Sequence, residues 1–312
     1  MPAIITHDLF GRDFHQRAPQ LVGSGKDERL AFLLGNQGPD PLFYAVADFR
    51  IRQWAHAGTV MHQQNSAALL AALPHAVAAL PPTDRAVGRA WAHGFMCHYA
   101  LDSTMHPLVH AIVYALCDAG VQGFSRQDAS MVHGVVESDL DEMALSVKKG
   151  VTVREFKPYE RILRGDAVLL DACSSLFSTL ARRAFGYAMP RGTYADAVRA
   201  FRRVQRFLYA PGETKRRLVK RAEQRLTHGY SRYDAMAHRA ILHERSDFDN
   251  EEHVPWINPF TGAQSDASFW DLYRRALGRA EEAVRAMDKP GFDVEAALGL
   301  TGGINFSGRI AD

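Results

Sequence analysis

Apolar residues recur at three- and four-residue intervals along most of this chain. Such spacing is typical of amphipathic α-helices, and the strict alternation expected of β-strands is nearly absent. The pattern predicts helices over 43–57, 62–80, 84–106, 108–119, 128–147, 154–185, 194–209, 213–243 and 268–288. We therefore expect an all-α protein.

Local signals support several of these boundaries. Thr152 and Glu155 have the spacing of a capping box, as do Ser268 and Asp271. Asp84 also stands where an N-cap residue belongs. A residue that precedes proline disfavours helical geometry, so Pro107 predicts that a helix ends or kinks at His106.

Three loops stand out along the chain. The segment from Gly35 to Pro41 is a rigid turn, rich in glycine and proline, that presents Asp40. Residues 246–268 form a long irregular stretch, and the tail after Pro290 is rich in glycine. We expect a helical core over 1–150 and a helical extension over 151–312, packed on that core or continuous with it as one domain.

The composition is that of a soluble globular protein. The 312 residues are 47% hydrophobic and 23% charged, with a net charge of +2. Three cysteines without a CxxC pair fit a reducing compartment. No signal-peptide pattern opens the chain and no apolar run is long enough to span a bilayer, so we predict a cytoplasmic protein without a transmembrane segment.

Histidines and carboxylates are spaced for metal binding. His98, Asp102 and His106 stand four residues apart, and His133 precedes Glu137 by four. Residues at this spacing point to one side of a helix, and imidazole and carboxylate are ligands that zinc accepts. The sequence therefore predicts a metal centre, to which three upstream residues at or near element ends are further candidates: His7, Asp40 and His62.

The order of these eight residues resembles that of the bacterial zinc-dependent phospholipase C family, whose fold is shared with fungal single-strand-specific zinc nucleases. The resemblance covers about residues 1–150, and its most specific piece is the segment 94–107. It implies a multi-helix bundle of the phospholipase C and zinc nuclease type, with the remainder as a helical extension. It also implies a zinc-dependent phosphoric ester hydrolase that carries two or three Zn²⁺ ions per chain.

The resemblance also implies which residues bind each ion. One ion would be bound by Asp40, His62, His98 and Asp102, and a second by His106, His133 and Glu137. His7 would bind a third, with Asp102 as a bridge. His110 is a rival to His106 in the second site. Members of the family complete the third site with an N-terminal tryptophan; here Pro2, exposed by removal of Met1, would have to replace it, and the alternative is a site with two ions or a weak third.

Paired metal ions suit phosphodiester hydrolysis, because they polarise phosphoryl oxygens and generate hydroxide near neutral pH. Asp40 is the candidate catalytic residue, since it could orient or deprotonate the attacking water. The substrate would be a phospholipid head group or a soluble phosphodiester. The alternatives are a nuclease or nucleotidase that uses the same metal site, and a non-catalytic metal-stabilised binding protein. The Thr6-His7-Asp8 segment also resembles the HD phosphohydrolases, which fit the other histidines poorly.

The second half of the chain is basic. Residues 199–225 contain ten Lys and Arg against two acidic residues. They form either a solvated helical face or a contact with an anionic partner, such as the phosphate head groups of a membrane or a nucleic acid. No helix-turn-helix, zinc finger or RNP signature accompanies them.

Overall fold

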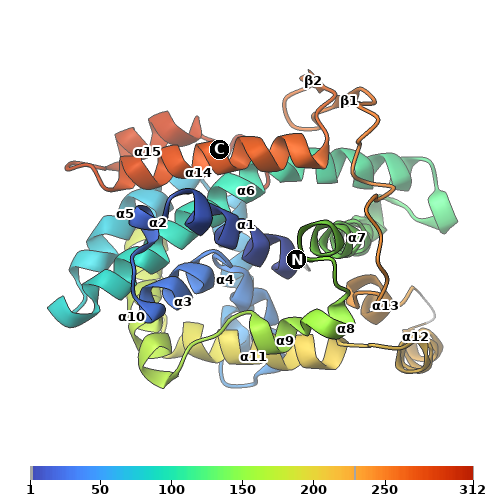
Figure 1. Cartoon of the computed structure of the whole chain (residues 1–312), viewed down its shortest axis with the longest axis horizontal. Helices are drawn as coiled ribbons and strands as arrows, with labels where there is room; N and C mark the ends of the chain where they lie inside the picture. Colours follow the sequence, from blue (N-terminus) through green and yellow to red (C-terminus); the bar gives the residue numbers. More distant parts are fainter. Residues whose placement is uncertain (1–2, 228–229, 312) are drawn as a thin grey trace. The chain divides into compact units, whose positions relative to one another are not determined.

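The computed structural model describes residues 3–227 and 230–311, and helices dominate it (Figure 1). The all-α prediction is confirmed. The first helices are α1 (Ile4–Arg17), α2 (Pro19–Val22), α3 (Lys26–Gly35), α4 (Ala55–Gln63), α5 (Ser66–Ala78), α6 (Arg85–Asp118) and α7 (Ala129–Lys149). They are followed by α8 (Val153–Phe156), α9 (Pro158–Arg161), α10 (Ala167–Phe185), α11 (Thr193–Leu208), α12 (Glu213–Thr227), α13 (Arg232–Met236), α14 (Phe269–Met287) and α15 (Val294–Thr301).

Other regular elements are short. The 3-10 helices are η1 (Asp40–Ala47), η2 (Arg52–Trp54), η3 (Pro82–Asp84), η4 (Val121–Gly123) and η5 (Arg126–Asp128). Strands β1 (Trp256–Ile257) and β2 (Gln264–Ser265) pair antiparallel inside the long loop that precedes α14. No helix among the described residues is both long enough and apolar enough to cross a membrane.

The described chain divides into two compact units. The first comprises the described residues of Met1–Leu9, Pro107–Arg161 and Arg203–Leu272; the second comprises those of Phe10–His106, Ile162–Arg202 and Tyr273–Asp312. Four of the five boundaries fall inside α1, α6, α11 and α14, and the fifth follows α9, so the two units alternate along the sequence. The division near residue 150 stays a prediction.

In the second unit, α3 crosses α6 at very close range. A Cβ atom at Gly94 of α6 would lie 2.0 Å from the carbonyl oxygen of Phe32 in α3, so only glycine permits this approach. Around the crossing, the buried ring of Trp91 packs edge-on against Tyr194, which stacks on Phe177. This packing fixes the end of α3, from which the turn toward Asp40 begins.

In the first unit, the helix α7 organises the packing through Asp141, which is fully buried. Its carboxylate accepts hydrogen bonds from the backbone amides of Ile5 (3.1 Å) and Thr6 (2.7 Å) at the start of α1. It also accepts one from Nε2 of His238, which follows α13 (3.0 Å). The start of α1 and the segment after α13 are therefore both attached to α7.

Both capping boxes are confirmed, since Thr152 pairs with Glu155 and Ser268 with Asp271. Of the two outcomes predicted at His106, the end of a helix is wrong, because α6 continues through Pro107 to Asp118; the kink stays a prediction. A proline inside a helix costs about 3 kcal/mol. Burial of an aliphatic side chain stabilises by about 1.5–3 kcal/mol, and three residues beyond the proline are almost completely buried: Leu108, Val109 and Val113.

Three other predicted segments differ in detail. The segment 43–57 is mostly 3-10 helix, and 154–185 is divided into α8, α9 and α10. Lys157 adopts a positive φ of 50° after α8, which ends that helix. The segment 213–243 contains α12 and α13. The pattern did not predict α1, because residues 4–11 are all buried although Thr6, His7 and Asp8 are polar, so the polar positions do not mark an exposed face.

Candidate metal centre

Four of the candidate ligands meet in the second unit. Asp40 begins η1, directly after the Gly-Pro turn, and His62 lies in the last turn of α4. His98 and Asp102 lie one turn apart on α6. All four side chains are almost completely buried, which is uncommon for carboxylates unless they pair or bind metal.

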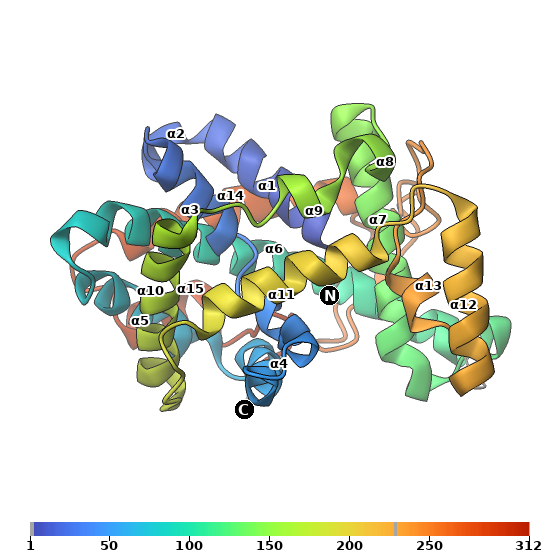
Figure 2. The same cartoon turned by 90° about the horizontal axis from the view of Figure 1, so that it is seen from below.

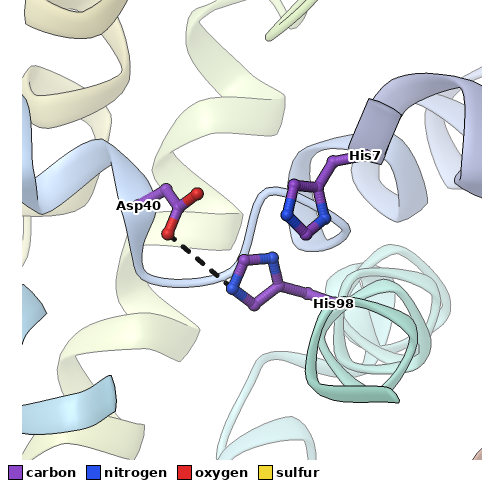
Figure 3. Close-up of side chains that lie close together, drawn as sticks. All are labelled: His7, Asp40 and His98. Atoms are coloured by element: carbon purple, nitrogen blue, oxygen red, sulfur yellow. Dashed lines mark ion pairs between the residues drawn. The ribbon is translucent and has the colours of Figure 1, made fainter. Parts of the chain in front are cut away.

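The nitrogen and oxygen atoms of this cluster are spaced as ligands of one ion. Nε2 of His62 lies 3.0 Å from Oδ1 of Asp40 and 3.6 Å from Oδ2 of Asp102. Nε2 of His98 lies 3.7 Å and 3.3 Å from the same two oxygens, and Figure 3 shows its pairing with Asp40. Ligand atoms about 2.0–2.1 Å from a tetrahedral zinc ion lie about 3.3–3.4 Å from one another. The donor set therefore fits zinc.

Hydrogen bonding leaves His62 ready to bind a cation. Its Nδ1 donates to the carbonyl oxygen of Gly58 (2.7 Å), so in the neutral ring Nε2 carries a lone pair. Neither this Nε2 nor Oδ1 of Asp40 has a hydrogen-bond partner among the described residues. Two buried atoms with lone pairs at 3.0 Å repel each other unless a positive charge lies between them.

Asp40 is placed to be an anionic ligand. Burial raises the pKa of its carboxyl group, but the neighbouring His98, and His62 when its Nε2 carries a proton, outweigh this effect and hold the pKa below its usual value. The turn before it contains Gly38, whose φ is +51° and whose carbonyl oxygen accepts a hydrogen bond from the Tyr194 hydroxyl (3.4 Å). The local backbone thus holds the carboxylate against His98.

His106 has the same ring orientation as His62. Its Nδ1 donates to the carbonyl oxygen of Phe306 (2.8 Å), so in the neutral ring the lone pair is on Nε2. Nδ1 also lies 3.9 Å from Oδ2 of Asp102, one turn earlier on α6. His106 therefore belongs to the same polar network as the four-residue cluster, although it does not share the cluster's ligand geometry.

Phe306 forms an apolar wall of this site that the sequence analysis missed. Its fully buried ring lies 5.1 Å from that of His62 and 5.6 Å from that of His98, between ring centroids. Two hydrogen bonds, both of 2.8 Å, hold the residues before Phe306 in place. The side chain of Asn305 donates to the carbonyl oxygen of Gln63, and the Tyr99 hydroxyl donates to that of Ile304. An aromatic residue inside a glycine-rich tail was the only signal available.

The remaining candidate ligands lie in the first unit. On α7, Nε2 of His133 lies 3.0 Å from Oε1 of Glu137, and the ring of His110 lies 5.1 Å from that of His133. His7 is buried on α1, directly after the two residues whose amides Asp141 binds. Asp141 follows Glu137 by four residues on α7, but the sequence analysis did not single it out.

A comparison with protein families supplies the identification. A model described as zinc dependent phospholipase C matches residues 5–187 of the 312-residue chain. The chain belongs to the zinc-dependent phospholipase C family. The match confirms the resemblance to this family, and the matched residues include all eight candidate ligands and extend beyond residue 150. Searches among curated proteins and among solved structures found no significant match.

This member of the phospholipase C family also has a carboxylate cluster outside the predicted ligands. Asp139, Glu142 and His243 in the first unit could hold a cation by their spacing. The guanidinium of Arg239 already provides one, because it forms ion pairs with both Asp139 and Glu142. We therefore assign this cluster a structural role.

Proposed function

We propose that this family member is a zinc-dependent phosphodiester hydrolase in which Asp40, His62, His98 and Asp102 bind one zinc ion. The observation that supports it best is the set of four nitrogen-to-oxygen distances of 3.0–3.7 Å, which fits a tetrahedral ion. The family match supports zinc independently of this geometry.

The proposal includes two further ions. His133 and Glu137, together with His106, are assigned to a second ion, and the orientation of the His106 ring supports this assignment. His110 remains the rival for that position, since it lies beside His133. A third ion is assigned to His7, with Asp102 as a bridge. Pro2, whose amine would complete that site, lies outside the described residues.

Catalysis follows from the chemistry of these groups. Zinc, when bound, polarises a phosphoryl oxygen and lowers the pKa of a water molecule. The carboxylate of Asp40 orients the attacking water and accepts its proton. Phe306 and Phe43, whose ring lies 5.0 Å from that of His62, exclude bulk water from the site, which strengthens its electrostatic interactions.

The family description favours a phospholipid as substrate, with a soluble phosphodiester as the other class. The test is a turnover assay with phosphatidylcholine, a nucleotide phosphodiester, single-stranded nucleic acid and a model ester, on protein that has been depleted of metal and reloaded with zinc. Activity should depend on zinc and be absent from His98→Ala. The exposed histidine of α5 provides the matched control His75→Ala, which should remain fully active.

The same assay separates the two alternatives. Cleavage of nucleic acid without cleavage of phospholipid would favour a nuclease. Loss of thermal stability on chelation, without turnover of any substrate, would favour a non-catalytic metal-stabilised protein.

A further inference from the structure

Helix α12 exposes two parallel rows of side chains. Arg217, Arg221 and Arg225 recur every four residues, and each is followed directly by an apolar residue: Leu218, Ala222 and Leu226. All six residues are exposed, with 61% of Leu218 and 84% of Leu226 accessible to solvent. Residues four apart lie above one another on a helix, so a basic row and an apolar row run side by side.

The opposite face of α12 fixes which rows point outward. Arg216 and Lys220 both pair with Asp234 of α13, at 2.5 Å and 2.6 Å. Val219 packs against the cluster of Leu208, Tyr233 and Ala237. Figure 2 shows α12 beside α13. The orientation of the helix is therefore determined by contacts that use none of the six exposed residues.

The outward charges are mostly uncompensated. Arg217 lies 3.7 Å from Glu213, an exposed pair that salt screens easily. Neither Arg221 nor Arg225 forms an ion pair with any residue that the structure describes. Arg221 and Arg225 are thus available to an anionic partner. Beside them, the exposure of the Leu218 and Leu226 side chains to water is unfavourable.

We propose that this face of α12 binds the surface of an anionic phospholipid membrane. Arginines would contact lipid phosphates, while Leu218 and Leu226 enter the boundary between head groups and acyl chains. A nucleic acid would satisfy the arginines but leave both leucines in water, and the exposed face carries no aromatic ring on which a base could stack. The membrane therefore accounts for both rows.

The proposal is tested with the full chain and vesicles of phosphatidylserine mixed with phosphatidylcholine, compared with phosphatidylcholine alone. Binding is measured by co-sedimentation at low and high salt. One variant is Arg217→Gln/Arg221→Gln/Arg225→Gln, and a second is Leu218→Gln/Leu226→Gln. Controls of equal size are Arg182→Gln/Arg183→Gln/Arg191→Gln and Val168→Gln/Val294→Gln, all at exposed positions elsewhere. Thermal unfolding establishes that each variant is folded.

We expect wild type to bind the anionic vesicles preferentially and to be released by salt. Each α12 variant should lower the partition coefficient by roughly tenfold or more, whereas both controls should bind like wild type. Absence of binding by wild type would overturn the proposal. So would loss of binding in the arginine variant with full binding in the leucine variant, because it would indicate a purely electrostatic contact.

Discussion

A Cβ atom at Gly38 would lie 2.1 Å from Cδ2 of His98. The turn that presents Asp40 and the helix that presents His98 therefore meet at a position where only glycine fits. The same glycine has a φ of +51°, which other residues rarely adopt. Its substitution is a direct test of whether the geometry of this turn supports the site.

We expect Gly38→Ala to lower zinc content and to reduce turnover by about tenfold or more, because a ligand displaced by about 1 Å loses catalytic geometry. The control is Gly186→Ala, where φ is +70° but nothing lies within 4 Å of the added Cβ. Both substitutions strain the backbone, so only the contact with His98 distinguishes them. Equal zinc content and turnover in the two variants would contradict the assignment.

Asp141 should hold the start of α1. We expect Asp141→Asn to destabilise the protein by about 1–3 kcal/mol, because hydrogen bonds to a buried charged group are lost. Hydrogen exchange at the amides of Ile5 and Thr6 should become faster, since both donate to this carboxylate. Unchanged protection of these two amides would show that α1 is held by other contacts. The control is Asp293→Asn at the N-cap of α15, where asparagine caps a helix about as well as aspartate.

Phe306 should stabilise the fold and shield the metal centre. Removal of a buried phenylalanine ring costs about 3–5 kcal/mol. We expect Phe306→Ala to lose stability in this range and to bind zinc more weakly, with Phe306→Leu intermediate in both. Urea unfolding and zinc titration measure the two effects. If Phe306→Ala bound zinc as tightly as wild type, the ring would have only a packing role.

Asp288 should make stability depend on pH. Burial raises the pKa of this carboxyl, but hydrogen bonds from His93 and Arg89 outweigh burial and hold the pKa well below its usual value. Because the pKa of Asp288 is lower in the folded than in the unfolded protein, its ionised carboxylate stabilises the fold at any pH above the unfolded pKa of about 3.9. This stabilisation is lost as the pH falls below that value. We expect Asp288→Asn to cost about 1–3 kcal/mol at pH 7.

Urea unfolding of both proteins between pH 7 and pH 3 provides the measurement. The difference in free energy of unfolding between wild type and Asp288→Asn should shrink as the pH falls below about 4. A difference that grew toward low pH would have the wrong sign for a depressed carboxyl pKa.

Local patterns could be predicted from the sequence, and distant contacts could not. The sequence predicted two ligand pairs, His98 with Asp102 and His133 with Glu137, because residues four apart lie side by side on the surface of a helix. Asp40 and His62 were candidates because they lie at or near element ends, and only their order in the family assigned them to the same ion as His98 and Asp102. Phe306 contributes from a segment 200 residues beyond His106, and no spacing rule connects the two.

At Pro107 a local signal in the sequence gave a wrong prediction. Its local preference for ending a helix is real, but the burial of Leu108 and Val109 outweighs it, and burial depends on the whole fold. Gly38 could be recognised as a turn residue from the sequence, whereas the reason that it must be glycine is a contact with His98, sixty positions away.

The central claim is that Asp40, His62, His98 and Asp102 bind a zinc ion. The most direct test is the number of zinc equivalents per chain, measured by elemental analysis of wild type, His62→Ala and His75→Ala after mild chelation and reloading. We expect two or three equivalents in wild type and His75→Ala, and a loss of at least one in His62→Ala. No zinc in reloaded wild type, or equal zinc in all three proteins, would contradict the account.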